Sequence, residues 1–135
     1  QTCALPIYDG DLDKFKETLH SLFAGIPYNN YTKNRIAKVE GYWASLVYCY
    51  LAGAGLEIIP EDVTNVGRID LTLKIGENIY IFEFKMKDNN NPLEQIKQRE
   101  YYVKYQKEQK NIYLVGVEFD EEKRNIAKFE WEELK

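Results

Sequence analysis

Three charged side chains interrupt two otherwise apolar segments in the middle of the chain. Asp70 lies in GRIDLTLKI (67–75), and Glu83 and Lys85 flank a phenylalanine in NIYIFEFKM (78–86). The Gly-Glu-Asn between the segments is a hairpin signal, so we predict two antiparallel strands. A two-residue turn would place Asp70 directly opposite Glu83, because side chains alternate between the two faces of a strand.

The same alternation predicts which face the three charges share. One face would carry the apolar side chains of both strands, namely Ile69, Leu71, Leu73, Ile75, Tyr80, Phe82 and Phe84. Asp70, Glu83 and Lys85 would then project together from the opposite face. We therefore predict one charged cluster facing away from the tyrosine and phenylalanine side chains.

Two opposed carboxylates are destabilising in a sheet unless a cation lies between them. Hard carboxylate oxygens suit Mg²⁺ or Mn²⁺, which keep bound water and accept phosphate oxygens. Lys85 on the same face could orient that water or stabilise charge that builds up on phosphorus. The alternative is a solvent-exposed group of four charges in which Arg68 and Lys85 neutralise the two acids. Such surface ion pairs would contribute little to stability.

Glu40 adds an independent observation. It falls near the middle of the apolar arc formed by Ile36, Trp43 and Val47 in a predicted helix. A carboxylate there is costly unless it is paired or binds a ligand. Glu40 is therefore a candidate third metal ligand, and the alternative is a buried pair with a Lys, Arg or Tyr.

The composition of the chain limits the kinds of metal site and partner that are expected. The chain has 135 residues and a formal charge of −4, so no global basic field favours nucleic acid. Two cysteines without a CxxC pair and a single histidine exclude a conventional zinc site. No apolar run reaches the roughly 20 residues of a membrane helix, so we expect no membrane association. This cysteine usage fits a reducing cytoplasm.

The first seven residues, QTCALPI, are the translation of the end of a widely used sequencing-library adapter. We expect residues 1–7 to be an adapter-derived, non-native segment of a gene assembled from metagenomic sequence. A chance heptamer is the alternative. Residues 8–135 would then form a single domain, the C-terminal part of a longer protein.

Periodicity and capping signals predict the order α-α-β-β-β-α-β-β. Asn91 followed by Pro92 and Glu94 is the clearest helix start. The helices and strands are expected at about 11–24, 32–52, 56–59, 68–75, 78–86, 92–109 and 111–119, followed by a last strand around 127–131. Strands interspersed with helices in this way predict an α/β fold, a mixed β-sheet flanked by helices on both faces.

An acidic residue on an early helix, then Asp, then Glu-x-Lys resembles the PD-(D/E)XK nuclease superfamily. Here the pattern is Glu40, Asp70 in GRIDL, and Glu83 with Lys85 in FEFK. LEQIKQREYYVKY, IYLVGVEFDEEKRNI and the closing FEWE extend the likeness to bacterial nuclease-like domains usually found C-terminal to an AAA-type ATPase-like domain. Ile69 stands where the superfamily name has proline. The resemblance implies a restriction-endonuclease-like core.

The resemblance also implies roles for individual residues. Mg²⁺ or Mn²⁺ would be bound by Glu40, Asp70, Glu83 and the carbonyl of Phe84, and the catalytic residues would be Asp70, Glu83, Lys85 and Gln95. Lys85 would position the attacking water, and Gln95 would point back at the site. Lys87, Arg99 and Tyr102 are candidate nucleic-acid-binding residues. Gln95, Arg99 and Tyr102 share one stripe of a helix at i, i+4 and i+7, and an ordinary solvated helix face is the alternative.

These observations favour a divalent-metal-dependent nuclease domain that hydrolyses DNA phosphodiester bonds. The main alternative is an inactive nuclease-fold module that binds nucleic acid or protein beside an upstream ATPase-like domain. A structural α/β domain with a surface charge cluster is a third possibility.

Overall fold

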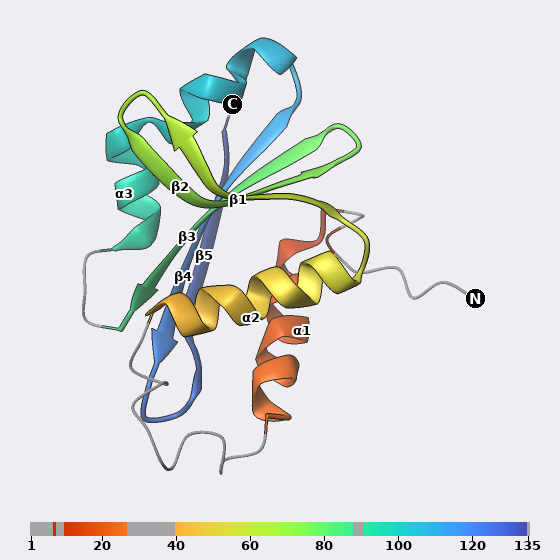
Figure 1. Ribbon diagram of the computed structural model, residues 1–135, viewed down its shortest axis with the longest axis vertical. Helices are drawn as coiled ribbons and strands as arrows, with labels where there is room; N and C mark the ends of the chain where they lie inside the picture. The colour runs from red at the N-terminus through yellow and green to blue at the C-terminus, as the bar shows by residue number, and fades with distance from the viewer. Residues whose placement is uncertain (1–6, 8–9, 27–39, 88–90, 135) are drawn as a thin grey trace.

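The computed structural model describes residue 7 and residues 10–26, 40–87 and 91–134, with the side chain of Glu40 left out (Figure 1). The elements follow the order α1 (Leu12–Ala24), α2 (Glu40–Gly53), β1 (Glu57–Thr64), β2 (Gly67–Ile75), β3 (Asn78–Met86), α3 (Pro92–Arg99), a 3₁₀ helix η4 (Tyr101–Glu108), β4 (Asn111–Asp120) and β5 (Asn125–Leu134). The predicted order of helices and strands is confirmed.

The strands form one mixed sheet in the order β1-β2-β3-β4-β5. β3 and β4 are parallel, and the other neighbouring pairs are antiparallel. The chain passes from β3 to β4 through α3 and η4, because parallel strands need a crossover connection. Figure 1 shows the strands fanning out from a narrow waist, as expected of a twisted sheet.

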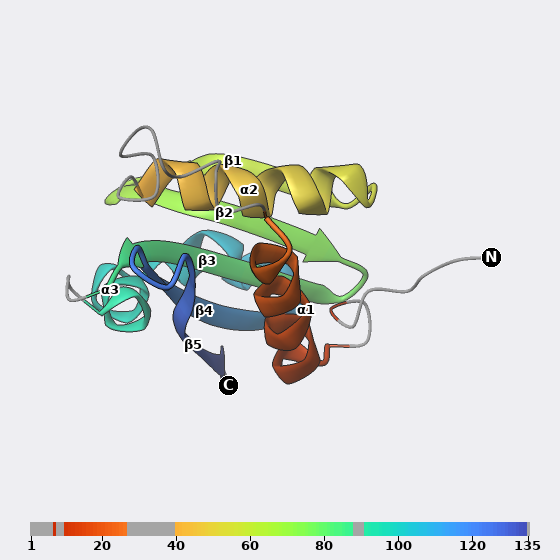
Figure 2. The ribbon, with the colours of Figure 1, turned by 90° about the horizontal axis from the view of Figure 1, so that it is seen from below.

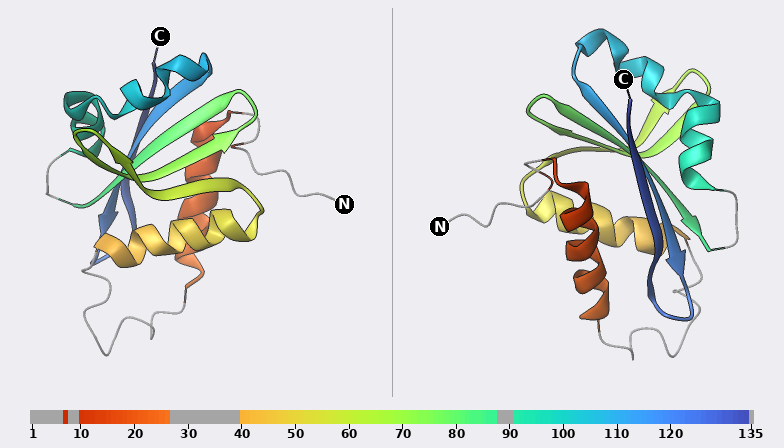
Figure 3. Two further views of the ribbon diagram at one scale, coloured as in Figure 1. Left: turned by 45° about the horizontal axis from the view of Figure 1, so that its top comes forward. Right: turned by 180° about the vertical axis from the view of Figure 1, so that it is seen from behind.

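Helices cover both faces of the sheet, as predicted. One core lies under α1 and α2 and contains Phe15, Trp43, Phe82 and Phe119. A smaller core lies under α3 and η4 and contains Ile79, Ile81, Ile96 and Leu114. Figure 2 shows α1 and α2 beside the strands, and the left view of Figure 3 separates α2 below from α3 and η4 above.

Helices α1 and α3 each begin at a side-chain cap. The carboxylate of Asp11 accepts a hydrogen bond from the backbone N–H of Lys14 (3.1 Å), and Asn91 accepts one from Glu94 (3.1 Å). These bonds satisfy N–H groups that the first turn of a helix leaves without partners. The predicted start at Asn91 is confirmed. Part of the second predicted helix, residues 32–39, lies outside the described residues.

The predicted helix over 92–109 is not continuous. Glu100 adopts a left-handed conformation (φ 51°), which ends α3, and the chain continues as the 3₁₀ helix η4. The i, i+4, i+7 spacing that joined Gln95, Arg99 and Tyr102 therefore does not hold for Tyr102. A left-handed glutamate has no sequence signal, because glycine is the residue that usually occupies such a position.

β1 is longer than predicted. It extends through Pro60 to Thr64, whereas the proline was expected to end it. β1 is an edge strand, where a proline that cannot donate a backbone hydrogen bond is tolerated. The next residue, Glu61, has a positive φ of 49°, so the edge strand is distorted immediately after the proline.

The predicted alternation of faces is wrong at the start of β2. Leu71 belongs to the core under α1 and α2, but Ile69 belongs to the opposite core under α3 and η4. The strand therefore changes the orientation of its side chains at Asp70. The cross-strand neighbour of Asp70 is the distorted Glu61, as the pairs Pro60–Leu71 and Asp62–Ile69 show. A regular two-residue alternation in the sequence cannot predict this distortion.

Candidate active site

The β2–β3 hairpin has the predicted register over its first half and then separates. The paired residues run from Ile75–Asn78 to Leu71–Phe82, with the predicted Leu73–Tyr80 pair between them. Beyond Leu71–Phe82 the link between the strands is made by a side chain and not by a backbone pair. Oδ2 of Asp70 accepts a hydrogen bond from the backbone N–H of Phe84 (2.8 Å). Asp70 is thus tied to the segment that carries the Glu-x-Lys motif.

Asp70 carries an electrostatic penalty. Burial raises the pKa of Asp70 above its ordinary value, although the Phe84 N–H bond and the charges of Lys85 and Arg68 act in the opposite direction. The nearby carboxylate of Glu61 raises this pKa further. The surroundings therefore do not fully compensate the negative charge of Asp70.

Glu83 lies on the other side of the hairpin, under α3. Its side chain is 3% exposed, and its Oε2 accepts a hydrogen bond from Nε2 of Gln95 at 2.6 Å. Nζ of Lys85 lies 3.8 Å from the same oxygen. The structure thus brings Lys85 and Gln95 to Glu83, and the charge of Lys85 also acts on Asp70. The predicted single face shared by all three charges is not formed, because Asp70 lines the cleft on the α2 side of the sheet whereas Glu83 lies under α3.

Gly116 allows α3 to approach Glu83 closely. It is the β4 residue paired with Glu83, and a Cβ atom on it would lie 2.6 Å from the backbone nitrogen of Leu93. The first turn of α3 therefore rests directly on the backbone of β4, which places Gln95 over Glu83. Sequence analysis missed this residue. A glycine inside an otherwise apolar strand is the signal that could have identified it.

A cleft of about 290 Å³ opens beside Asp70 on the α2 side of the sheet. Its walls come from α2, from β1 and from the separated ends of β2 and β3. The lining residues are Gly41, Ala44, Ser45, Tyr48, Pro60, Glu61, Asp70, Leu71 and Phe84. Asp70 and Phe84 are the predicted site residues among them, and the two are joined by the hydrogen bond from the Phe84 N–H to Asp70.

The remaining predicted residues lie around this centre. Glu40 is the first described residue of α2, with its side chain outside the description. Lys87 follows β3, and its Nζ lies 3.5 Å from a carboxylate oxygen of Asp120. Arg99 is exposed beside Gly67 at the start of β2. Tyr102 packs against the core under α3 and η4.

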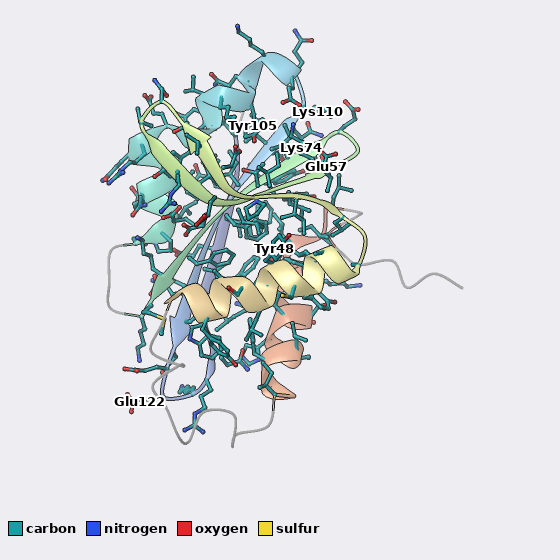
Figure 4. All side chains as sticks on the ribbon, in the orientation of Figure 1. Tyr48, Glu57, Lys74, Tyr105, Lys110 and Glu122 are labelled. Atoms are coloured by element: carbon teal, nitrogen blue, oxygen red, sulfur yellow. The ribbon has the colours of Figure 1, made fainter. Side chains whose placement is uncertain are left out.

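Asp62 in β1 is another buried acid, but its oxygens are already engaged. Oδ2 accepts hydrogen bonds from the hydroxyls of Thr72 (2.9 Å) and Tyr105, and Oδ1 from Nζ of Lys104. Burial alone would raise the pKa of Asp62, yet these bonds lower it below its ordinary value. Lys74 also lies over the ring of Tyr105, labelled in Figure 4. Asp62 therefore attaches η4 to the sheet.

The described parts of the chain, which do not include the Glu40 side chain, contain no group of three or more His, Cys, Asp or Glu side chains placed to hold a metal ion. No helix in residues 10–26, 40–87 and 91–134 is long and apolar enough to cross a membrane.

Comparison with known proteins identifies the family. Residues 38–129, well over half of the chain, match the family model of the PD-(D/E)XK nuclease superfamily. The chain belongs to the PD-(D/E)XK nuclease superfamily. The matched segment contains the whole site, from the first turn of α2 to the middle of β5. The fold predicted from the resemblance agrees with this assignment.

The PD-(D/E)XK domain is also similar to a protein of Azotobacter chroococcum mcd 1 described as an uncharacterized protein in the vnfD 5′ region. The two are 39% identical over 117 residues, which is 84% of this chain. The chain spans 23% of the length of that relative. The likeness therefore concerns one part of a considerably longer protein.

Proposed function

We propose that this chain is a divalent-metal-dependent nuclease domain that hydrolyses phosphodiester bonds in DNA. The observation that carries the proposal is the bond that joins Asp70 to the strand segment carrying Glu83 and Lys85, at the end of the β2–β3 hairpin. Asp70 is bonded to the backbone of Phe84, and Lys85 lies 3.8 Å from Glu83. Membership of the PD-(D/E)XK superfamily supports the same chemistry.

The side chains present fit a hard divalent cation. Asp70 retains an incompletely compensated charge, as its raised pKa shows, and a cation would remove that penalty. Carboxylate and carbonyl oxygens are the ligands that Mg²⁺ and Mn²⁺ prefer. Asp70, Glu83, the Phe84 carbonyl and Glu40 would hold the ion. When bound, it would supply Lewis-acid stabilisation and lower the pKa of a coordinated water.

Other side chains of the protein would orient the metal ligands, hold the attacking water and contact the nucleic acid. Gln95 donates to Glu83 and fixes the orientation of that carboxylate, as outer hydrogen bonds do for metal ligands in general. The ammonium group of Lys85 lies 3.8 Å from Glu83 and its charge lowers the pKa of Asp70, so it can hold the attacking water and stabilise the negative charge that develops on the phosphate. Lys87, Arg99 and Tyr102 would contact the nucleic acid around this centre.

The test is cleavage of plasmid and oligonucleotide DNA with Mg²⁺ or Mn²⁺. We expect Asp70→Ala and Lys85→Ala each to lower the cleavage rate by roughly 10²–10³-fold, because each removes charge stabilisation of the transition state. Lys16→Ala, which removes an exposed lysine from α1, should cleave like the unmodified chain.

Cleavage that survives both Asp70→Ala and Lys85→Ala would contradict the mechanism. If no variant and no metal gives cleavage while DNA binding persists, the inactive binding module is the correct function. Thermal melting of every variant verifies that lost cleavage is not lost folding.

We further propose that this domain works beside an upstream AAA-type ATPase-like domain in a longer bacterial protein of the cytoplasm. The much greater length of the Azotobacter relative supports a longer protein. The segment 1–7, which is predicted to be adapter-derived, contributes one described residue to the fold. Ile7, the described residue of that segment, is buried in the core, and its carbonyl accepts a hydrogen bond from the hydroxyl of Tyr80 (3.1 Å).

A further inference from the structure

We infer that the cleft between α2 and β1 takes one unpaired base, so that the substrate is single-stranded DNA. This inference rests on the proposed function, since it concerns the strand whose phosphate would reach Asp70. The cleft has a volume of about 290 Å³, near the lower end of the range for small-molecule sites. Such a space suits one nucleotide.

The lining of the cleft is chemically suited to a flat, uncharged ring. Tyr48 on α2 is 38% exposed and lines one wall, and Pro60 of β1 lines another. Figure 4 labels Tyr48 on the part of α2 that runs along β1. Bases stack on aromatic side chains regardless of sequence, and this stacking contributes about 1–3 kcal/mol per base.

Charge favours a base over a phosphate in the cleft itself. Asp70 and Glu61 both line it, Arg68 pairs with Glu61 (3.5 Å), and the described lining residues include no lysine or arginine to bind a phosphate beside Tyr48. Lys85 lies at the other side of Asp70, next to Glu83. A strand whose base occupies the cleft would therefore direct its phosphate toward Lys85.

The α2 wall is kept open by small side chains at helical spacing. Gly41, Ala44, Ser45 and Tyr48 follow i, i+3, i+4 and i+7, so they share one side of the helix. A Cβ on Gly41 would meet nothing within 4 Å among the described residues. The glycine adds no side chain to this part of the cleft wall.

A base that lies in the cleft is separated from its pairing partner, which is why we infer a single-stranded substrate. In a duplex the bases are paired and stacked inside, and a base enters a pocket only after it leaves the stack, at a cost of a few kcal/mol. An already unpaired base enters without that cost. The cleft should therefore select single strands, flaps or frayed ends over intact duplex.

The test uses the Asp70→Asn chain in the presence of a chelator, so that binding is measured without cleavage. The probe is a DNA oligonucleotide that contains 2-aminopurine, whose fluorescence falls when the base stacks. We expect quenching with the single strand and at least about tenfold weaker binding of the same sequence as a duplex, since unstacking is needed there.

Variants assign the binding to the cleft. Tyr48→Leu should weaken single-strand binding by about tenfold and remove the quenching, while Tyr48→Phe should retain both, because only the ring is needed. Ser45→Leu should also weaken binding by filling the cleft. Trp131→Leu, which removes an equally exposed aromatic from β5, and Ser21→Leu on α1 should bind normally.

Equal or tighter binding of the duplex, or full binding by Tyr48→Leu, would overturn this inference. Cleavage by the unmodified chain with Mg²⁺ or Mn²⁺ is scored separately. Cleavage with duplex preference contradicts the single-strand inference and leaves the nuclease function standing. Tyr48-dependent single-strand binding without any cleavage contradicts the nuclease function and supports the cleft.

Discussion

The two carboxylates at the end of the β2–β3 hairpin lie in contrasting surroundings. Glu83 is buried under α3, where Gln95 and Lys85 both approach one of its oxygens. Asp70 faces the cleft under α2, accepts one backbone N–H, and has a raised pKa. The α3 side thus holds its acid in a fixed place, while the α2 side leaves its partly buried acid with an incompletely compensated charge.

This difference suggests separate roles for the two acids, one in setting the geometry of the site and the other in binding the cation. A carboxylate that is fixed by donors sets geometry, whereas one with uncompensated charge gains most from a cation. Under the proposed function, Glu83 would define where the metal lies and Asp70 would supply much of the driving force for binding it. The variants below test that division.

Gly116→Ala should have the largest effect on the α3 side. The added methyl would collide with the backbone of Leu93, so α3 must move away from β4. We expect the free energy of unfolding in urea to fall by about 1–3 kcal/mol, the usual cost of overpacking. Cleavage should fall by roughly 10–100-fold, because Gln95 would no longer hold Glu83.

Gly53→Ala is the matched control, since a Cβ there, at the end of α2, would meet no described atom within 4 Å. It should unfold at the same urea concentration as the unmodified chain or a higher one. Equal stability of Gly116→Ala and Gly53→Ala would show that α3 does not depend on this close approach.

Gln95→Leu tests the fixed carboxylate directly. It removes the amide that donates to Glu83 and leaves that acid buried with one donor fewer. Losing a hydrogen bond to a buried charged group costs about 1–3 kcal/mol, which urea unfolding would measure. Gln98→Leu, on an exposed position of the same helix, should leave stability unchanged. Similar losses in both variants would mean that the bond to Glu83 does not contribute.

Removing each charge should change stability in opposite directions. Asp70→Asn keeps an oxygen that can accept from Phe84 but eliminates the penalised charge, so we expect the melting temperature to rise by roughly 2–6 °C. Glu83→Gln should lower it, because a charged acceptor for Gln95 and Lys85 is lost. A lower melting temperature for both variants would contradict the contrast between the two sides.

The pH dependence gives the smallest effect. The pKa of Asp70 in the folded chain is raised above the ordinary 3.8, so just above pH 3.8 the native state binds more protons than the unfolded state. The unmodified chain should therefore lose stability relative to Asp70→Asn as the pH rises from about 4 toward neutrality. Urea midpoints of both chains over this range measure the difference. A constant difference would mean that Asp70 titrates normally.

Much of the site could be predicted from the sequence because its signals are local. The hairpin register follows from the turn, and the start of α3 follows from Asn91 and Pro92. Glu83 and Lys85 could therefore be placed together, whereas the position of Gln95 near them was implied by the resemblance to the nuclease superfamily. The structure confirms that these three residues meet.

The rest depends on contacts between distant segments. Ile69 and Leu71 face opposite cores because the adjacent edge strand is distorted at Glu61, on another part of the chain. The end of α3 depends on a left-handed Glu100, which propensity disfavours. The close approach at Gly116 depends on α3 docking on β4. None of these features has a periodic pattern.

Pro60 and Glu61 have a consequence for the solution behaviour of the chain. An exposed edge strand is a template on which strands of other molecules can pair and start aggregation. On β1, an incoming strand would meet a proline without an N–H group and then a backbone distorted by a positive φ. Continuous pairing is interrupted at the middle of the edge, so the same two residues that line the cleft also protect the sheet from self-association.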